Sequence, residues 1–402
     1  MEHNLDHIPQ FLTLLRAAIW GTPYSAPPET DWMAIRQELK HHAIQNLPVD
    51  LLVQADPAHQ MQYIQSSAKA CTHWYNLMGV QHQLTMLLQD AGIRCATIKG
   101  AAADIYYRQP LYRTMGDIDI LVHPQDFQKT ISLLVSNGYQ LHDERNPRHT
   151  EFIMDGIPIE VHRHFATLSQ AERVQQMDAM LFDALQSAIP CSIEGYTFSM
   201  LPPKENGIVL IEHINSHMEA GLGLRQIIDW MLYVDQCLDD AAWFGGFQQI
   251  VSAVGLEKLA VTVTRMCQLY LGLRTDITWC QLADEDLCQR LLMHTLQQGN
   301  FGRKQDRRSN GTLSVLNILD SDRNFFRILQ RHGCHNWKAL QRHPWLKPFA
   351  WAYQLCRYIR KGLRGKHPLR AFFRSLKRKS QNTDLLSQLE VQRKDHTLAY
   401  EE

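Results

Sequence analysis

The sequence predicts an α+β protein in which a small mixed β-sheet is embedded in a mostly helical chain. Apolar residues recur at helical spacing over the first ~90 residues and again after about residue 202. Between these regions lie short alternating runs, two of them joined by Asp155-Gly156, a dipeptide that strongly predicts a β-hairpin. The length of 402 residues favours several domains, and a hydrophobic content of 45% excludes a wholly disordered chain.

The first predicted region is helical and covers residues 1–90. Its apolar residues follow the period of a helix, and Thr22-Pro23 and Pro27-Pro28 interrupt the pattern where the chain must turn. The predicted helices are residues 11–19, 32–39 and 61–88.

The second region, residues 91–201, carries the predicted sheet. The run 95–98 ends at Lys99-Gly100, which is typical of a strand that leads into a helix. A proline at residue 124 and Asn137-Gly138 bound an amphipathic helix. The predicted strands are residues 95–98, 117–122, 150–154, 157–162 and 196–201, and the predicted helix covers 124–137.

The rest of the chain is predicted to be mainly helical. Helical periodicity covers residues 208–235, 241–273 and 284–297, so we expect a helical domain over residues 202–320. A basic, aromatic-rich helical region over residues 321–383 and a polar tail over 384–402 complete the chain.

The charge of the chain is balanced overall but unevenly distributed. Residues 323–383 contain 16 Lys and Arg residues and no Asp or Glu, although the whole chain has 41 basic and 41 acidic residues. Such a region suits an anionic membrane surface, nucleic acid or an acidic protein face, and its plainer interpretation is a solvated helix face. We predict that residues 357–379 form a pair of interfacial helices broken at Lys366-His367-Pro368.

Two aspartates in the strand 117–122 point to metal chemistry. Side chains two residues apart lie on the same face of a strand, so Asp117 and Asp119 project together while the isoleucines beside them face a core. Glu160 also lies between two apolar residues of a predicted strand. Three acids on adjacent strands can hold two Mg²⁺ ions ~3.5–4 Å apart, an arrangement that catalyses nucleotidyl transfer. The alternative is a solvated strand edge whose carboxylates bind nothing.

Several motifs follow one another in a characteristic order. They are Ile98-Lys99-Gly100, Tyr106-Tyr107, Pro110, Arg113, Asp117-Ile-Asp119-Ile-Leu-Val and Ile159-Glu160-Val161-His162. Over about residues 60–240 this order resembles the bacterial nucleotidyltransferase-like proteins of the DNA polymerase β superfamily. The resemblance is closest to an uncharacterised subgroup with Leu-Lys-Gly where the wider superfamily has Gly-Ser or Gly-Gly.

The resemblance implies a polymerase-β-like palm as the sheet and assigns roles to several residues. Asp117, Asp119 and Glu160 match the acids that bind two Mg²⁺ ions, and Gly100 matches the glycine of the phosphate-binding turn. The chain differs from the wider superfamily in Lys99-Gly100-Ala101, because alanine has no hydroxyl group to offer a triphosphate.

Three further residues near these acids have two interpretations each. Lys99 adds positive charge for the phosphates or faces solvent. Arg113 forms a guanidinium fork for the phosphates or is a structural partner of Asp117 or Asp119. His162 is expected to be a packed or supporting histidine, with a transition-metal ligand as the lesser alternative.

The helical domain carries His217, a glycine turn, Arg225 and Asp229, which also resemble the pattern of the subgroup. An Arg and an Asp four residues apart can pair along a helix, and a nearby histidine can join them. We expect a buried polar network that fixes two helices. The alternative is contact with the base, the ribose or the acceptor.

Together these features predict a Mg²⁺-dependent nucleotidyltransferase that moves a nucleoside monophosphate from an NTP, expected to be ATP, to a hydroxyl acceptor. One alternative is a catalytically inactive module of the same fold that binds a nucleotide or a partner, because the turn lacks the serine. Another is a transferase that acts on RNA, because residues 323–383 are basic.

The expected location is cytoplasmic, with peripheral contact to a membrane through residues 323–383 as a further expectation. The first residues have neither the basic nor the apolar segment of a signal peptide. The nine cysteines show no Cys-x-x-Cys pair, which favours a reducing compartment.

Overall fold

The computed structural model describes residues 6–302, 330, 333–334, 337–341, 343–363 and 383–391. The chain divides into two compact units, one of residues 1–301 and 389–402 and the other of residues 302–388. All the described strands and all the predicted site residues lie in the first unit. Helices and one mixed sheet make up this unit, which confirms the α+β class.

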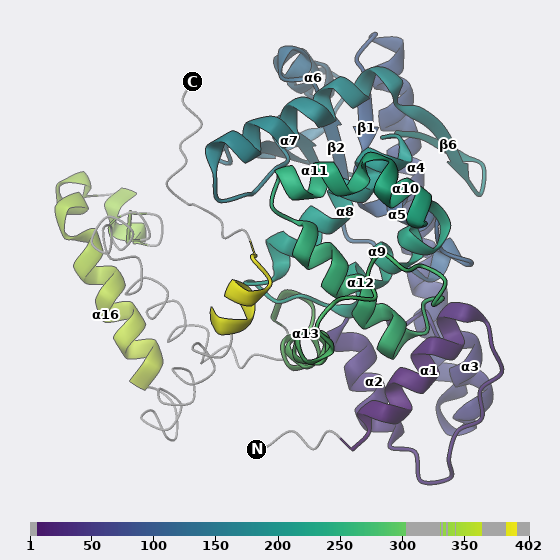
Figure 1. Cartoon of the computed structure of the whole chain (residues 1–402). Helices are drawn as coiled ribbons and strands as arrows, with labels where there is room; N and C mark the ends of the chain where they lie inside the picture. Colours follow the sequence, from purple (N-terminus) through teal and green to yellow (C-terminus); the bar gives the residue numbers. More distant parts are fainter. Residues whose placement is uncertain are drawn as a thin grey trace. The chain divides into compact units, whose positions relative to one another are not determined.

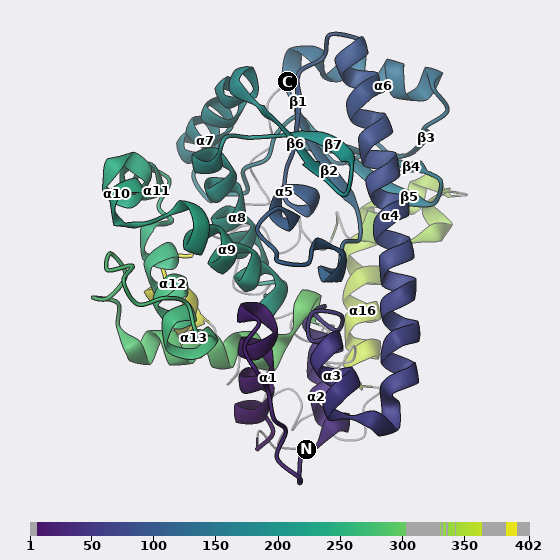
Figure 2. The same ribbon diagram turned by 90° about the vertical axis from the view of Figure 1, so that its right-hand side faces the viewer.

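Four helices form the N-terminal part of the first unit. They are α1 (Ile8–Trp20), α2 (Trp32–His41), α3 (Val49–Ala55) and α4 (Gln60–Asp90). Asp31 begins α2 as its N-cap residue, because its Oδ1 accepts a hydrogen bond of 2.9 Å from the backbone N–H of Ala34. The long helix α4 reaches from α3 to the sheet (Figure 2). Its residues Trp74 and Leu84 are fully buried.

The sheet has seven strands in the order β3-β4-β5-β2-β1-β7-β6. In chain order they are β1 (Cys95–Thr97), β2 (Ile118–Val122), β3 (Gln140–Asp143), β4 (His149–Met154), β5 (Ile157–His162), β6 (Ile189–Ile193) and β7 (Tyr196–Met200) (Figure 1 and Figure 2). The neighbouring strands β2 and β5 are parallel, with Asp119 directly beside Glu160. This pairing brings the two acidic motifs of the sequence together.

The two faces of the central strands differ in chemistry. Ile118, Ile120 and Ile159 point into a hydrophobic core with residues of α4 and α6 (Pro124–Ser136). The alternate residues, Asp119 and Glu160 among them, therefore face the other way, because side chains of a strand alternate between its faces. Figure 2 shows the sheet between α4 and α6 on one side and the helices α7, α8 and α9 on the other.

The remaining helices of the first unit lie between the strands or after them in the sequence. Ala101 and Ala102 of the short helix α5 (Gly100–Asp104) also pack in the core of the sheet. The other helices are α7 (Ala171–Ala184), α8 (Pro203–His217), α9 (Leu224–Cys237), α10 (Asp240–Ala242), α11 (Gln248–Ala253), α12 (Glu257–Leu271) and α13 (Glu285–Gln298).

The sequence did not predict the two edge strands of the sheet. In β3 the first three residues are exposed, so no apolar alternation marks it. The other edge, β6, contains Pro190, which interior strands exclude because proline cannot donate a ladder hydrogen bond. The predicted boundaries between the helical region 1–90, the core 91–201 and the helical domain 202–320 stay predictions.

In the second unit the structure describes α16 (Ala350–Leu363), which overlaps the first half of the predicted interfacial helix pair. Residues 364–382, with Lys366-His367-Pro368, lie outside the described residues. None of the described helices combines the length and apolarity that crossing a bilayer requires. The predicted membrane contact and cytoplasmic location stay predictions.

Candidate active site

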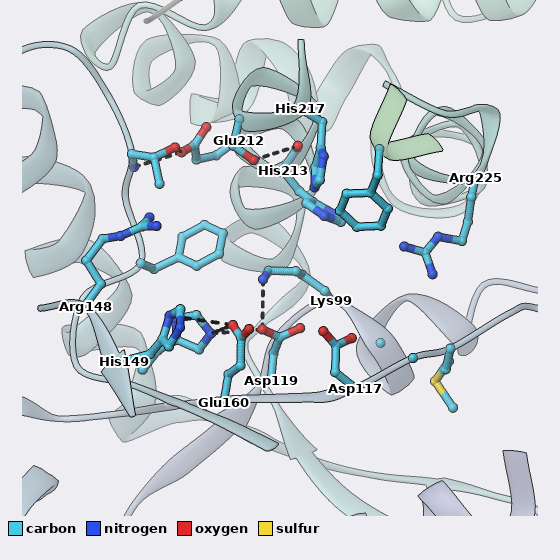
Figure 3. Close-up of a pocket in the computed structure, with 18 of the residues that line it drawn as sticks. Lys99, Asp117, Asp119, Arg148, His149, Glu160, Glu212, His213, His217 and Arg225 are labelled. Carbon is cyan, nitrogen blue, oxygen red and sulfur yellow. Dashed lines mark hydrogen bonds and ion pairs between the residues drawn. The ribbon is translucent and has the colours of Figure 1, made fainter. Parts of the chain in front are cut away.

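Three carboxylates form one wall of a cavity of about 270 Å³. Asp119 lies on β2 and Glu160 beside it on β5, while Asp117 directly precedes β2 on the same face. Figure 3 shows the three carboxyl groups side by side and pointing into the cavity. The structure therefore brings together the three acids that the sequence singled out.

Asp119 is the most strongly paired of the three acids. Its Oδ1 lies 2.9 Å from Nζ of Lys99 and 2.9 Å from Nε2 of His162, which both donate to it. Burial would raise the pKa of Asp119, but the two nitrogen groups hold it well below its usual range. Asp119 is therefore an anion that Lys99 and His162 stabilise.

Asp117 has the opposite electrostatic character. The negative charge of Asp119 raises the pKa of Asp117 to about 6, and burial adds to this shift. Lys99 and Arg225 act against it. The face thus carries more negative charge than its own cations balance, and a divalent cation would relieve this repulsion.

Lys99 points into the cavity and does not follow the solvent-facing alternative. Its backbone has φ 59° and ψ −139°, a region that non-glycine residues avoid and that costs ~1–3 kcal/mol. This conformation precedes Gly100, which also lines the cavity at the start of α5. The strained turn therefore places both predicted phosphate-binding residues beside the carboxylates.

His162 and a second histidine, His149, flank Glu160. Nε2 of His162 lies 3.1 Å from Oε2 of Glu160, and Nδ1 of His149 lies 3.6 Å from the same oxygen. Hydrogen bonds to Asp119 and Glu160 raise the pKa of His162 against the opposing effect of burial. His162 thus lies within hydrogen-bonding distance of two acids, and its predicted role stays a prediction.

Arg113 makes contacts different from both interpretations of the sequence. Its Nε donates to Asp229 over 2.7 Å, its Nη2 to the other oxygen of Asp229 over 2.8 Å, and its Nη1 to Asp104 over 3.0 Å. All three side chains are buried. Because every nitrogen of the fork already donates to a carboxylate, the guanidinium serves as a structural link between α5 and α9.

The expected pairing of Arg225 with Asp229 along α9 does not form, because Asp229 pairs with Arg113. Nη1 of Arg225 donates to the carbonyl oxygen of Thr114 over 2.8 Å, and its Nε is buried without a hydrogen-bond partner among the described residues. Burial and the charge of Arg113 lower the pKa of Arg225. Its guanidinium lines the cavity and lies on the side of Asp117 (Figure 3).

The side of the cavity opposite the carboxylates is formed by α8 and by Phe301. The rings of His213 and His217 are 4.7 Å apart, and Phe301 lies 4.9 Å from His217. Glu212 accepts a hydrogen bond of 2.8 Å from the backbone N–H of Thr167. The three carboxylates thus form the floor of the cavity, and His213, His217 and Phe301 form its roof. This arrangement suits a planar ligand that carries anionic groups.

A family model for an uncharacterised nucleotidyltransferase matches residues 28–272 of this chain. The chain belongs to this family. The match spans the sheet, the three acids and the histidine-rich helix α8. The activity in the family's description fits a cavity built around paired carboxylates.

A search of solved structures gives a relative with the same general description. It is an antigenic nucleotidyltransferase-like protein from Paracoccidioides brasiliensis, with 17% sequence identity and a TM-score of 0.34. The match covers 49% of this chain and 93% of that chain. No curated protein sequence matches the chain.

His149 and Glu212 are among the polar residues of this nucleotidyltransferase-family cavity that sequence reasoning missed. His149 pairs with His162 across β4 and β5, and the two-residue turn Asp155-Gly156 fixes that register. Counting back from the turn would have placed His149 opposite His162. Glu212 was signalled by a lone carboxylate inside an otherwise apolar stretch of helix.

Proposed function

We propose that the protein transfers a nucleoside monophosphate from an NTP to a hydroxyl acceptor, with Mg²⁺ held by Asp117, Asp119 and Glu160. The observation that carries this proposal is the convergence of three carboxylates on one face of two paired strands in a cavity. Family membership supports the class of reaction.

The carboxylates fit the ion that the reaction needs. Mg²⁺ prefers oxygen ligands and is usually held by one or two carboxylates together with substrate phosphates. The raised pKa of Asp117, caused first by the charge of Asp119, marks an excess of negative charge at this place. Bound Mg²⁺ would neutralise charge on the phosphates and position the reacting oxygens.

The residues of the chain supply the other parts of the site. Arg225 offers a guanidinium that no carboxylate engages within ion-pair distance among the described residues, which suits the phosphates of the NTP. Lys99 and the backbone at Gly100 add a positive charge and N–H groups beside them. Glu160 would accept the proton of the attacking hydroxyl group, with His162 hydrogen-bonded to its carboxylate.

The roof of the cavity suits the rest of the substrates. His213, His217 and Phe301 offer flat surfaces on which a base or a sugar can pack. Burial and the neighbouring His217 hold the pKa of His213 well below its usual value, so its ring is neutral. A neutral ring adds no charge that would compete with the Mg²⁺ ions.

The first test measures nucleotide binding by isothermal titration calorimetry with each NTP, with and without Mg²⁺. The Asp117→Asn/Asp119→Asn double variant should weaken Mg²⁺-dependent binding by ~10–100-fold or more, because it removes two oxygen ligands. Asp155→Asn is the matched control, since Asp155 is exposed in the hairpin turn and asparagine tolerates its positive φ. Equal binding in the parent and the double variant would defeat the proposal.

A second candidate is a non-catalytic nucleotide-binding module of the same fold. The ion pair between Lys99 and Asp119 favours it, because a built-in ammonium group occupies one carboxylate of the proposed metal site. Pyrophosphate release, measured over a broad panel of hydroxyl acceptors, separates the two candidates. Release that depends on the acceptor supports the transferase, and nucleotide binding without release supports the module.

A further inference from the structure

We propose that His149, Glu160 and His162 form a separate site for a first-row transition-metal ion such as Zn²⁺. Each residue offers one ligand atom, and the three atoms all lie within 4.8 Å of one another. The site shares Glu160 with the proposed Mg²⁺ site but does not depend on nucleotide transfer.

Two of the three separations between the donor atoms are close to those around one ion, and the third is no more than 4.8 Å. Two ligands at ~2.0–2.1 Å from a metal in tetrahedral or octahedral geometry lie roughly 3.0–3.4 Å apart. Oε2 of Glu160 lies 3.1 Å from Nε2 of His162 and 3.6 Å from Nδ1 of His149. An ion would therefore bind after small movements of the side chains, and it would replace the proton by which Nε2 of His162 is hydrogen-bonded to Asp119 and Glu160.

His149 supplies an observation independent of the acids. The residue is 7% exposed and lines the cavity, and its Nδ1 is buried without a hydrogen-bond partner among the described residues. A buried polar atom left in this way is uncommon in proteins and is often explained by a water molecule or an ion. A metal ion bound at Nδ1 supplies the missing interaction.

The other nitrogen of His149 faces a second carboxylate. Nδ2 of Asn146 donates a hydrogen bond to its Nε2 over 3.1 Å, and Oε1 of Glu151 lies 3.5 Å from the same nitrogen. A metal on Nδ1 requires the proton to be on Nε2, so metal binding would replace the hydrogen bond from Asn146 by one that Nε2 donates to Glu151. Metal-binding histidines commonly donate their second N–H to a carboxylate, which fixes the tautomer.

The donor set selects a different ion from the one at the three acids. Two imidazoles and one carboxylate suit Zn²⁺ and its neighbours, whereas Mg²⁺ prefers oxygen ligands. Strand pairing holds the set, because His149 faces His162 across β4 and β5 and Glu160 is two residues before His162. The protein therefore offers two adjacent cation sites of unlike chemistry on one sheet face.

The test titrates Co²⁺, a spectroscopic substitute for Zn²⁺, into the full-length protein after its metals have been removed by dialysis against EDTA. The visible absorption of bound Co²⁺ should appear with one equivalent and should persist in excess Mg²⁺. His149→Gln should lower the Co²⁺ affinity at least ~10-fold, since even the loss of an outer hydrogen-bond partner costs that much. His142→Gln, an exposed histidine on β3, is the matched control and should bind Co²⁺ as the parent does.

Equal Co²⁺ affinity in His149→Gln and the parent would overturn the proposal, as would displacement of Co²⁺ by Mg²⁺. X-ray absorption of the Zn²⁺-loaded parent gives a measurement that needs no variant: two imidazole ligands support the site, and fewer overturn it. Neither readout uses nucleotide. The titrations of the Asp117→Asn/Asp119→Asn variant therefore test the proposed function separately from this site.

Discussion

At the scale of single residues, two arginines of the cavity have different environments and hence different roles. Arg113 is held by the carboxylates of Asp104 and Asp229, so its charge is already balanced. Within the described part of the chain, Arg225 donates only to the carbonyl oxygen of Thr114, and its buried Nε has no hydrogen-bond partner. Arg113, which the sequence predicted to bind the phosphates, is therefore less available to them than Arg225, which the sequence named only as a possible supporting or substrate-binding residue.

Arg225→Gln should weaken binding of Mg²⁺–NTP by ~10–100-fold, because a hydrogen bond to a charged group contributes ~1.5–3 kcal/mol. The melting temperature should fall only modestly, since among the described residues the change breaks one hydrogen bond, to Thr114, and no ion pair. Titration calorimetry and thermal unfolding measure the two effects, with the exposed Arg94→Gln as the control. Unchanged nucleotide affinity in Arg225→Gln would show that the phosphates bind elsewhere.

At the scale of elements, alternation along the strands explains why much of the site could be predicted. Asp117, Asp119 and Glu160 stand among apolar residues at the period of a strand, and the sequence alone places each on a polar face. That the two motifs share one face required the parallel pairing of β2 with β5, which short-range patterns do not contain. The pairing of His149 with His162 could have been predicted from the hairpin turn, because the residues of β4 and β5 pair in order outward from Asp155-Gly156.

The closeness of Asp117 and Asp119 on one strand face predicts a pH dependence. The charge of Asp119 raises the pKa of Asp117 to about 6, so below this pH the folded protein holds a proton where a cation would bind. Affinity for Mn²⁺, used as a probe for Mg²⁺, should therefore rise with pH and level off above about pH 7, falling up to ~10-fold per unit below about pH 6.

Electron paramagnetic resonance of free Mn²⁺ between about pH 5 and 8 measures this dependence without nucleotide. Asp117→Asn is the control, because it removes the titrating group and should bind Mn²⁺ more weakly with a shallower dependence on pH. An affinity of the parent that stays constant over the same interval would contradict the assignment of Asp117 as a ligand.

At the scale of the whole first unit, a buried ion-pair network joins the sheet region to the helical region. Asp104 belongs to α5, Asp229 to α9, and Arg113 lies in the chain that leads to β2. Trp74 of α4 and Tyr107 donate further hydrogen bonds to Asp104 and Asp229 respectively. These partners are as far as 122 residues apart in sequence, so no local pattern could have revealed them.

Arg113→Met should lower the free energy of unfolding by ~3–5 kcal/mol, because it leaves two carboxylates buried without their cation. Burial already raises the pKa of Asp104 to about 7 against the effect of Arg113. Urea denaturation followed by circular dichroism measures the loss. Arg145→Met is the control, since Arg145 pairs with Asp143 on the surface and its loss should leave the midpoint unchanged. A similar midpoint in Arg113→Met would refute the structural role.

The ammonium group of Lys99 has a consequence for how the protein withstands scarcity of divalent ions. Because Lys99 places a positive charge 2.9 Å from Asp119, the acidic strand face is partly neutralised by the chain itself. On the proposed function, folding would therefore not depend on magnesium, unlike that of small domains that fold only around their metal. The protein would stay folded when the ion is scarce and could bind it again once the supply returns.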